Sequence, residues 1–182
     1  MGRGALMEQK AIFLDRDGVL NKALIRQGKP YAPKDVAELI IPEDVSSSLH
    51  CLKSLEYKLI VVTNQPDVAR GLCSREAVEA VNQRLMAQLP LDEVRVCYHD
   101  DEDKCTCRKP LPGMLLEAAL SHKIQLKKSV MIGDRWRDID AGYHAGCKTI
   151  LLQETVLNEP LNQHPDFIAS SLTQAVHWIK ES

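Results

Sequence analysis

Two aspartates, Asp15 and Asp17, stand at the end of an apolar run in the sequence AIFLDRDGVLN. Carboxylates this close repel each other, and a bound cation would relieve the repulsion. In such a site one aspartate could attack phosphorus while its neighbour transfers the proton of the leaving group. A simple turn at Gly18 is the structural alternative. A calcium loop is excluded, because it needs an acidic residue where Val19 stands and a glutamate where Arg26 stands.

Further residues could complete this chemistry. Asp134, in GDRWRDID, could bring a third carboxylate to the cation, with Asp138 one helical turn further along. Oxygen ligands that leave room for water suit Mg²⁺, whose coordination a substrate phosphate often completes. The hydroxyl of Thr63 and the amine of Lys109, in CRKP, could contact the phosphoryl oxygens. Together these residues predict a magnesium-dependent site for phosphoryl transfer.

A second metal site is predicted in CYHDDEDKCTC, which contains Cys97, His99, Cys105 and Cys107. Three thiolates and one imidazole form a closed tetrahedral ligand set for structural Zn²⁺. The alternative is a reduced, unliganded thiol cluster in a polar loop. The isolated cysteines, which we expect to be small core residues, are Cys51, Cys73 and Cys147.

The elements that must position these groups alternate along the chain. Strand-like apolar runs cover residues 10–14, 58–63, 93–98, 129–133 and 148–153. Segments with helical character cover residues 43–56, 74–89, 113–123, 138–146 and 171–181. This alternation predicts a Rossmann-like, doubly wound α/β domain whose parallel sheet is covered on both faces. The irregular residues 21–42 are expected to form loops over one end of the sheet.

Four of the five strand-like runs end in polar residues that could do chemistry. These are Asp15 and Asp17, then Thr63, Asn64 and Gln65, then Cys97 and His99, and finally Asp134. Ligands of open parallel sheets bind beyond the carboxyl ends of the strands. The convergence of these endings therefore predicts one shared site.

Length and charge limit the kinds of partner. The chain of 182 residues is the size of one domain, which we expect to span residues 10–182 after an N-terminal extension of residues 1–9. The net charge of −2 gives no reason to expect a nucleic-acid or membrane partner. The N-terminus lacks an apolar segment of signal-peptide length, which predicts a cytoplasmic protein. We expect a monomer with an open site, because the sequence leaves little room for a cap domain.

The motifs FLDRDG, VVTNQ, CRKP and IGDRWRD resemble, in this order, the four signature motifs of the haloacid dehalogenase (HAD) superfamily of phosphatases. The resemblance covers essentially the whole chain from about Lys10 onward. Within the superfamily the chain resembles the branch that contains heptose bisphosphate phosphatases and histidinol phosphatases. Because that branch lacks a large cap domain and carries a zinc-binding loop, the resemblance implies an HAD-like fold with Mg²⁺ and structural Zn²⁺.

The resemblance implies roles for the matching aspartates. Asp15 would be the nucleophile that forms an aspartyl-phosphate, and would also bind Mg²⁺. Asp17 would be the general acid and base, and would contact Mg²⁺ through its backbone carbonyl. Asp134 would be a further Mg²⁺ ligand, with Asp138 supporting it.

The resemblance also implies contacts to the substrate. Thr63 and Asn64 would position the phosphate and the nucleophile, and Lys109 would neutralise developing charge. Arg108 resembles the family's contact to a substrate phosphate. Arg70, in DVARG, would be a further substrate contact, with a solvated surface arginine as the alternative.

Two features of the sequence favour different substrates. DVARG (67–71) and KPLPGML (109–115) resemble the heptose bisphosphate enzymes, whereas the short stretch between His99 and Cys105 resembles histidinol phosphatase. We expect a sugar phosphate, D-glycero-D-manno-heptose 1,7-bisphosphate, which would lose its 7-phosphate, with histidinol phosphate as the alternative. A nucleic-acid 3′-phosphatase is less favoured, because aromatic residues make up only 4 % of the chain and no Lys/Arg cluster stands out. A non-catalytic zinc-binding module would leave the acidic strand ends unexplained.

Overall fold

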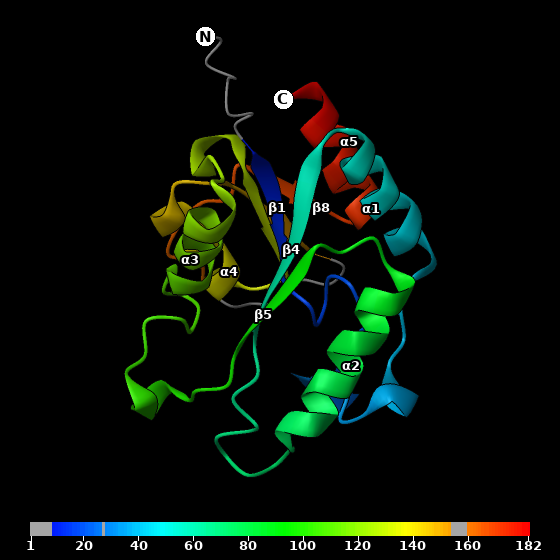
Figure 1. Cartoon of the computed structure of the whole chain (residues 1–182), viewed down its shortest axis with the longest axis vertical. Helices are drawn as coiled ribbons and strands as arrows, with labels where there is room; N and C mark the ends of the chain where they lie inside the picture. Colours follow the sequence, from blue (N-terminus) through cyan, green and yellow to red (C-terminus); the bar gives the residue numbers. More distant parts are fainter. Residues whose placement is uncertain (1–8, 27, 154–159) are drawn as a thin grey trace, which may run out of the picture.

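A parallel sheet of six strands forms the centre of the protein (Figure 1). The structure, a computed structural model, describes residues 9–26, 28–153 and 160–182. The strand order is β5-β4-β1-β6-β7-β8, and every neighbouring pair is parallel. The strands are β1 (Lys10–Leu14), β4 (Tyr57–Asn64), β5 (Glu93–Cys97), β6 (Val130–Gly133), β7 (Lys148–Leu152) and β8 (Phe167–Ala169). The predicted doubly wound α/β sheet is confirmed, and the short edge strand β8 is an addition to it.

Helices cover both faces of this sheet. In the described ranges they are α1 (Glu43–Ser54), α2 (Arg75–Gln88), α3 (Gly113–His122), α4 (Trp136–Ala145) and α5 (Leu172–Glu181). Figure 1 shows α3 and α4 on one side of the strands and α1 and α5 on the other. None of these helices is long and apolar enough to cross a lipid bilayer.

Strand β1 shows why the sheet can be covered on both faces. Its alternate side chains, Ile12 and Leu14, belong to one apolar cluster together with residues of α1 and α5. Ala11 and Phe13 belong to a second cluster with residues of α3 and α4. Because successive side chains of a strand point to opposite faces, a continuous apolar run buries both sides of the sheet at once.

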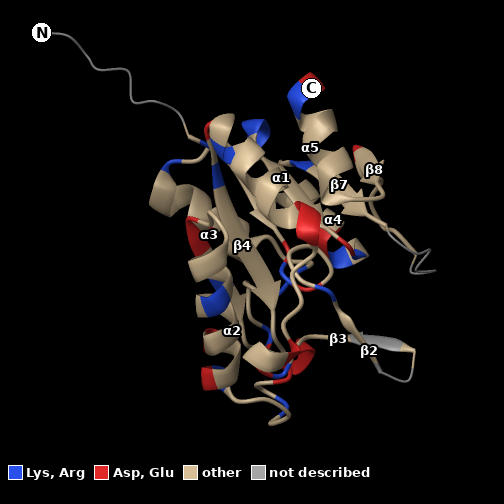
Figure 2. Ribbon diagram, turned by 90° about the vertical axis from the view of Figure 1, so that its right-hand side faces the viewer, with Lys and Arg blue, Asp and Glu red and all other residues tan. Residues whose placement is uncertain are grey.

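Residues 21–42 were predicted to form loops alone, but they also contain two short strands and a 3₁₀ turn. Strands β2 (Leu24–Arg26) and β3 (Lys29–Tyr31) form an antiparallel hairpin, and the 3₁₀ turn η1 (Val36–Glu38) follows. Three-residue strands are too short to show an alternating pattern, and Pro30 is tolerated because both strands of an isolated pair are edge strands. In Figure 2 the hairpin lies toward the end of the molecule to which β4 points, where loops over the sheet were expected.

The three isolated cysteines differ in environment. Cys147 is buried in the apolar cluster under α3 and α4, and Cys51 is partly buried and packs against the cluster under α1 and α5, as expected. The prediction is wrong for Cys73, which is partly exposed and belongs to neither apolar cluster. Its Sγ lies 3.5 Å from the carbonyl oxygen of Ser74 and 4.0 Å from that of Lys34. The turn before α2 therefore keeps this side chain near the surface.

Candidate active site

A cavity of about 320 Å³ opens at the carboxyl ends of β1, β4 and β6. This is the point where the chain leaves β1 for β4 on one side and later returns to β6 on the other, which is the usual ligand position in such sheets. The predicted site residues that line it are Asp15, Asp17, Asn64, Arg70, Arg108, Lys109, Asp134 and Asp138. The structure therefore brings together the endings of three strands and the start of α4.

Lys109 lies between two aspartates at the inner end of the cavity. Its Nζ is 2.9 Å from Asp15 Oδ1 and 2.6 Å from Asp138 Oδ1. Both Lys109 and Asp138 are only 2 % exposed. Burial disfavours the charged amine, but Asp138 and Asp15 outweigh this effect and raise the pKa of Lys109 above its usual value. The cavity therefore contains a fixed cation beside the carboxylate that ends β1.

Three carboxylates meet at this place. Oxygens of Asp15, Asp134 and Asp138 lie within 4.8 Å of one another. Burial and the charge of Asp138 raise the pKa of Asp15 to about 7, although Lys109 lowers it. Burial and then the charges of Asp15 and Asp138 raise the pKa of Asp134 well above its usual value. Carboxylates that are this crowded and this buried need a compensating cation to be ionised together.

The surroundings of Asp134 fit such a cation. Its Oδ1 is buried and has no hydrogen-bond partner in the described part of the chain. Gly18, at a φ of +88°, lies so close that a Cβ atom there would be 2.1 Å from Asp134 Oδ2. Only glycine allows the backbone to approach in this way. An unpaired carboxylate oxygen among other hard oxygen donors matches the ligand preference of Mg²⁺.

Asp17 lies outside this group of three carboxylates, although its charge also raises the pKa of Asp15, and it is held by its own donors. Gln65 Nε2 donates to its Oδ2 at 2.7 Å, and Asn21 Nδ2 donates to its Oδ1 at 2.9 Å. The guanidinium of Arg16 lies 3.1 Å from Oδ2. Arg16 is completely buried, and its Nη1 donates to Asn82 Oδ1 on α2 at 2.8 Å. Gln65 is one of the predicted strand endings, whereas the bond between Arg16 and Asn82 could not be expected from the sequence, because only the fold brings α2 next to the loop after β1.

Asn64 and Thr63 end β4 but take different positions. Asn64 Nδ2 donates to the Lys109 carbonyl oxygen at 2.9 Å, and the Lys109 N–H donates back to Asn64 Oδ1 at 3.1 Å. Thr63 is buried, and its Oγ1 accepts a hydrogen bond from Gln65 Nε2 at 2.9 Å. Thr63 is not among the residues that line the cavity. Asn64 therefore fixes the backbone that carries Lys109, whereas Thr63 lies behind the side chain of Gln65.

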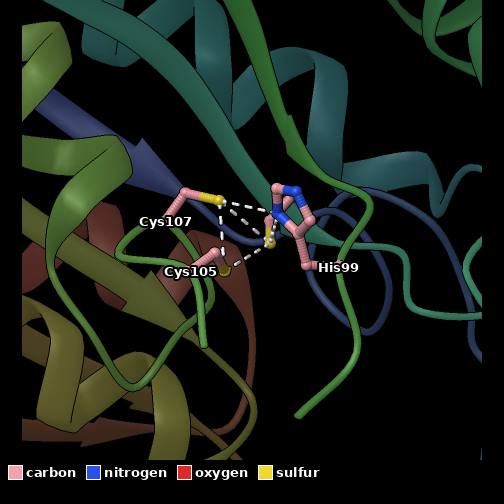
Figure 3. A group of neighbouring side chains, drawn as sticks. His99, Cys105 and Cys107 are labelled. Atoms are coloured by element: carbon pink, nitrogen blue, oxygen red, sulfur yellow. Dashed lines mark hydrogen bonds between the residues drawn. The ribbon is translucent and has the colours of Figure 1, made fainter. Parts of the chain in front are cut away.

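The predicted zinc ligands converge beside this strand end (Figure 3). Cys97 ends β5 opposite Asn64, and Cys105 and Cys107 return to it from the following loop. The distances between sulfur atoms are 3.2, 3.5 and 3.7 Å, and His99 Nδ1 lies 3.3 and 3.6 Å from the sulfurs of Cys107 and Cys97. Tetrahedral zinc with Zn–S bonds of about 2.3 Å separates its sulfur ligands by about 3.8 Å. The donor set therefore fits zinc.

The loop between these ligands also carries the acidic partners of the cavity's arginines. Asp100 is the N-cap of the 3₁₀ turn η2 (Asp101–Asp103), and Asp101 lines the cavity. Asp100 accepts two hydrogen bonds of 2.7 Å from Arg70. Asp101 Oδ1 accepts from Arg108 Nε at 2.8 Å and from Arg137 Nη1 at 3.2 Å, and these bonds lower its pKa to about 2. Arg137 also lines the cavity, and it was not among the predicted site residues, although it directly precedes Asp138.

Known proteins resemble this chain over most of its length. Residues 106–175 match a family model described as HAD-hydrolase-like. D-glycero-beta-D-manno-heptose-1,7-bisphosphate 7-phosphatase of Helicobacter pylori strain J99 is 35 % identical over 181 residues, which cover 94 % of this chain and 97 % of that protein. D-glycero-D-manno-heptose-1,7-bisphosphate 7-phosphatase of Thermosynechococcus vestitus is also 35 % identical, over 95 % of this chain and 96 % of that protein.

A solved structure has the same fold. The crystal structure of D,D-heptose 1,7-bisphosphate phosphatase from Bordetella bronchiseptica, in complex with magnesium and phosphate, matches with a TM-score of 0.81 at 28 % identity. The match covers 95 % of this chain and 99 % of that one. Magnesium and phosphate are thus present together in a protein of the same architecture.

Proposed function

The chain belongs to the HAD superfamily of phosphatases, and on that premise we propose that it removes the 7-phosphate from D-glycero-D-manno-heptose 1,7-bisphosphate. The relatives of 35 % identity carry the name of this activity and match nearly the whole chain. The observation that carries the proposal is the position of Asp15, whose carboxylate faces Lys109 at 2.9 Å in the cavity at the end of β1. A nucleophile next to a fixed cation is what attack on a phosphate ester requires.

The reaction follows from the roles of two aspartates. An oxygen of Asp15 attacks phosphorus, and the bond between phosphorus and the sugar oxygen breaks as Asp17 gives its proton to that oxygen. Water then attacks the aspartyl-phosphate, returns a proton to Asp17 and releases inorganic phosphate from Asp15. Asn21, Gln65 and Arg16 fix the position of the Asp17 carboxylate outside the group formed by Asp15, Asp134 and Asp138, which leaves its side chain free of the metal-binding role.

The metals have separate sites in this proposal. Asp15 and Asp134 hold Mg²⁺ with their carboxylates and Asp17 with its backbone carbonyl, while Asp138 supports the site through its bond to Lys109. When bound, Mg²⁺ offsets the charge of the carboxylates and of the phosphate. The four zinc ligands are structural, because three cysteines and one histidine leave no open coordination position; they are Cys97, His99, Cys105 and Cys107.

The remaining predicted residues bind or position the substrate. Lys109 neutralises charge on the transferred phosphate, and Asn64 holds the backbone of Lys109 in place. Thr63 does not line the cavity, and it acts on the site by accepting a hydrogen bond from Gln65, whose side chain also donates to Asp17. Arg70 and Arg108 contact the substrate from the outer part of the cavity, which both of them line.

The product of the reaction tests the substrate assignment. With Mg²⁺ and the heptose 1,7-bisphosphate, ³¹P NMR should show loss of the 7-phosphate resonance while the 1-phosphate resonance remains. Histidinol phosphate, offered at the same concentration, should be hydrolysed at least 100-fold less efficiently. A preference for histidinol phosphate, or release of the 1-phosphate, would contradict the proposal.

A further inference from the structure

We propose that Arg137 joins Arg108 in a two-arginine clamp for the second phosphate of the substrate, and that Asp101 occupies this clamp until that phosphate displaces it. The inference rests on the proposed function, because it requires a substrate with two phosphates. It adds a specificity-determining residue, Arg137, and a carboxylate that competes with the ligand.

The two arginines meet on one atom although they come from different elements. Arg108 follows the last zinc ligand, and Arg137 lies in the first turn of α4. Arg108 Nε and Arg137 Nη1 donate to the same oxygen, Asp101 Oδ1, at 2.8 and 3.2 Å. A shared acceptor oxygen shows that both guanidinium groups can reach a single anionic group. Planar guanidinium groups are well suited to bind phosphate.

The clamp stands directly beside the reacting centre. Lys109 follows Arg108 in the sequence, and Asp138 follows Arg137. Lys109 Nζ and Asp138 Oδ1 are 2.6 Å apart, and this contact joins the segment after the Cys/His cluster to the first turn of α4. Arg108 and Arg137 connect the same two segments through their shared partner Asp101. All of these residues line one cavity. A substrate whose first phosphate lies at Lys109 therefore presents its other end toward the arginines.

The exposure of the side chains indicates that Asp101, and not Arg108 or Arg137, can move away from this contact. The side chain of Asp101 is 59 % exposed, whereas those of Arg108 and Arg137 are 11 % and 30 % exposed. Each arginine also has a second support. Arg108 Nη1 donates to the His99 carbonyl oxygen at 3.2 Å, and the Arg137 guanidinium lies 5.1 Å from the centre of the Trp136 ring. The arginines therefore keep their positions when Asp101 moves into solvent.

Charge favours the replacement of the Asp101 carboxylate by a substrate phosphate at the two arginines. An exposed carboxylate gains little from its ion pairs, because water competes for both partners. A phosphate brings up to two negative charges and three acceptor oxygens to the same donors, and its hydrogen bonds with arginine are charge-assisted. A bisphosphate can therefore displace Asp101, whereas a monophosphate bound at Lys109 leaves it in place.

Ligand binding without turnover tests the role of Arg137. In protein carrying Asp15→Asn, calorimetry compares the heptose 1,7-bisphosphate with the heptose 7-phosphate, with and without Arg137→Met. Loss of one charge-assisted contact should weaken bisphosphate binding about 10- to 100-fold. Binding of the 7-phosphate should change less than about 2-fold, because it does not reach the clamp. Arg84→Met is the matched control, since Arg84 is exposed on α2 and does not line the cavity.

Each outcome decides the matter. The proposed clamp would be overturned if Arg137→Met lowered the affinities for the bisphosphate and the 7-phosphate equally, or if it lowered neither affinity. The clamp would also be overturned if the parent protein bound the bisphosphate no more tightly than the 7-phosphate. Failure of the proposed function is seen separately, as absence of Mg²⁺-dependent phosphate release by the wild-type protein.

A second variant tests the displacement of Asp101. Asp101→Asn removes the competing charge and should tighten bisphosphate binding roughly 2- to 10-fold while binding of the 7-phosphate stays the same. Glu102→Gln is the control, because Glu102 lies in the same turn and makes no ion pair with any other described residue. Unchanged or weaker bisphosphate binding in Asp101→Asn would show that Asp101 supports the arginines and is not displaced.

Discussion

Asn64 and Lys109 exchange two hydrogen bonds, in which the Asn64 side chain binds both the carbonyl oxygen and the N–H of Lys109 at 2.9 and 3.1 Å. Asn64 ends a central strand, whereas Lys109 follows the zinc loop. The sheet therefore sets the position of the lysine that faces Asp15. This relationship connects the loop that carries the Cys/His cluster to the lysine beside Asp15, and it makes Asn64 a positioning residue.

Replacing Asn64 should displace Lys109 without unfolding the protein. Asn64→Ala removes both bonds, and we expect kcat to fall about 10- to 100-fold, because small displacements of a catalytic group are costly. The thermal midpoint should fall by only a few degrees, since each hydrogen bond contributes about 1 kcal/mol. Asn162→Ala is the control, because Asn162 donates to Asp140 Oδ2 and does not line the cavity. An unchanged kcat in Asn64→Ala would show that these bonds do not position Lys109.

The sequence was sufficient to predict every strand of the parallel sheet except β8, and the convergence of polar residues at the edge of that sheet. The apolar runs are long enough to identify the central strands, and the helical segment predicted to begin at residue 74 does so, with Ser74 as the N-cap that accepts a hydrogen bond from the Ala77 N–H. The acidic cluster consists of Asp15 and Asp134, which come directly after strands, and Asp138, which lies in the first turn of a helix. In a parallel sheet these ends must lie on the same side, so the cluster did not depend on details of packing.

Contacts that depend on register and loop shape could not be predicted in this way. Asn64 reaches Lys109 because it pairs with Cys97 across β4 and β5. Arg137 meets Asp101 only because the zinc loop folds back toward α4. Neither contact leaves a periodic pattern or a fixed spacing in the sequence. Both arise from the way in which separate segments pack.

Magnesium should stabilise the protein more strongly at high pH. Because the pKa of Asp15 is raised from 3.8 to about 7, the folded metal-free protein binds this proton more tightly than the unfolded chain. This carboxyl therefore contributes stability at low pH that is lost as the pH rises through this range. At pH 8 a Mg²⁺ concentration 100-fold above Kd should raise the thermal midpoint by about 5 °C, and at pH 5 the rise should be smaller.

Asp134→Asn provides the test of where magnesium acts. This variant removes a proposed ligand and should abolish the increase in thermal midpoint at pH 8. Glu76→Gln, an exposed position on α2, should retain it. An equal Mg²⁺ response in all three proteins would locate the ion away from the acidic cluster.

Loss of zinc should impair catalysis through the loop that carries Arg108 and Lys109. Cys107→Ser removes one ligand, so the metal content should fall from about one zinc per chain to nearly none. We expect kcat/KM for the heptose bisphosphate to fall at least 10-fold, because the loop loses its fixed shape. Cys73→Ser, outside the cluster, should keep both zinc and activity. Full activity in a zinc-free Cys107→Ser protein would separate the zinc site from the active site.

The proposed role of Asp15 as nucleophile is tested by phosphate release from the heptose 1,7-bisphosphate, measured for the wild-type protein and Asp15→Asn with and without Mg²⁺. Asn has nearly the same size as Asp but cannot act as the anionic nucleophile. We expect rapid, Mg²⁺-dependent release of one phosphate per substrate molecule by the wild type, and a rate lower by roughly 1,000-fold or more for Asp15→Asn. Equal rates in the two proteins, or no release by the wild type, would contradict it.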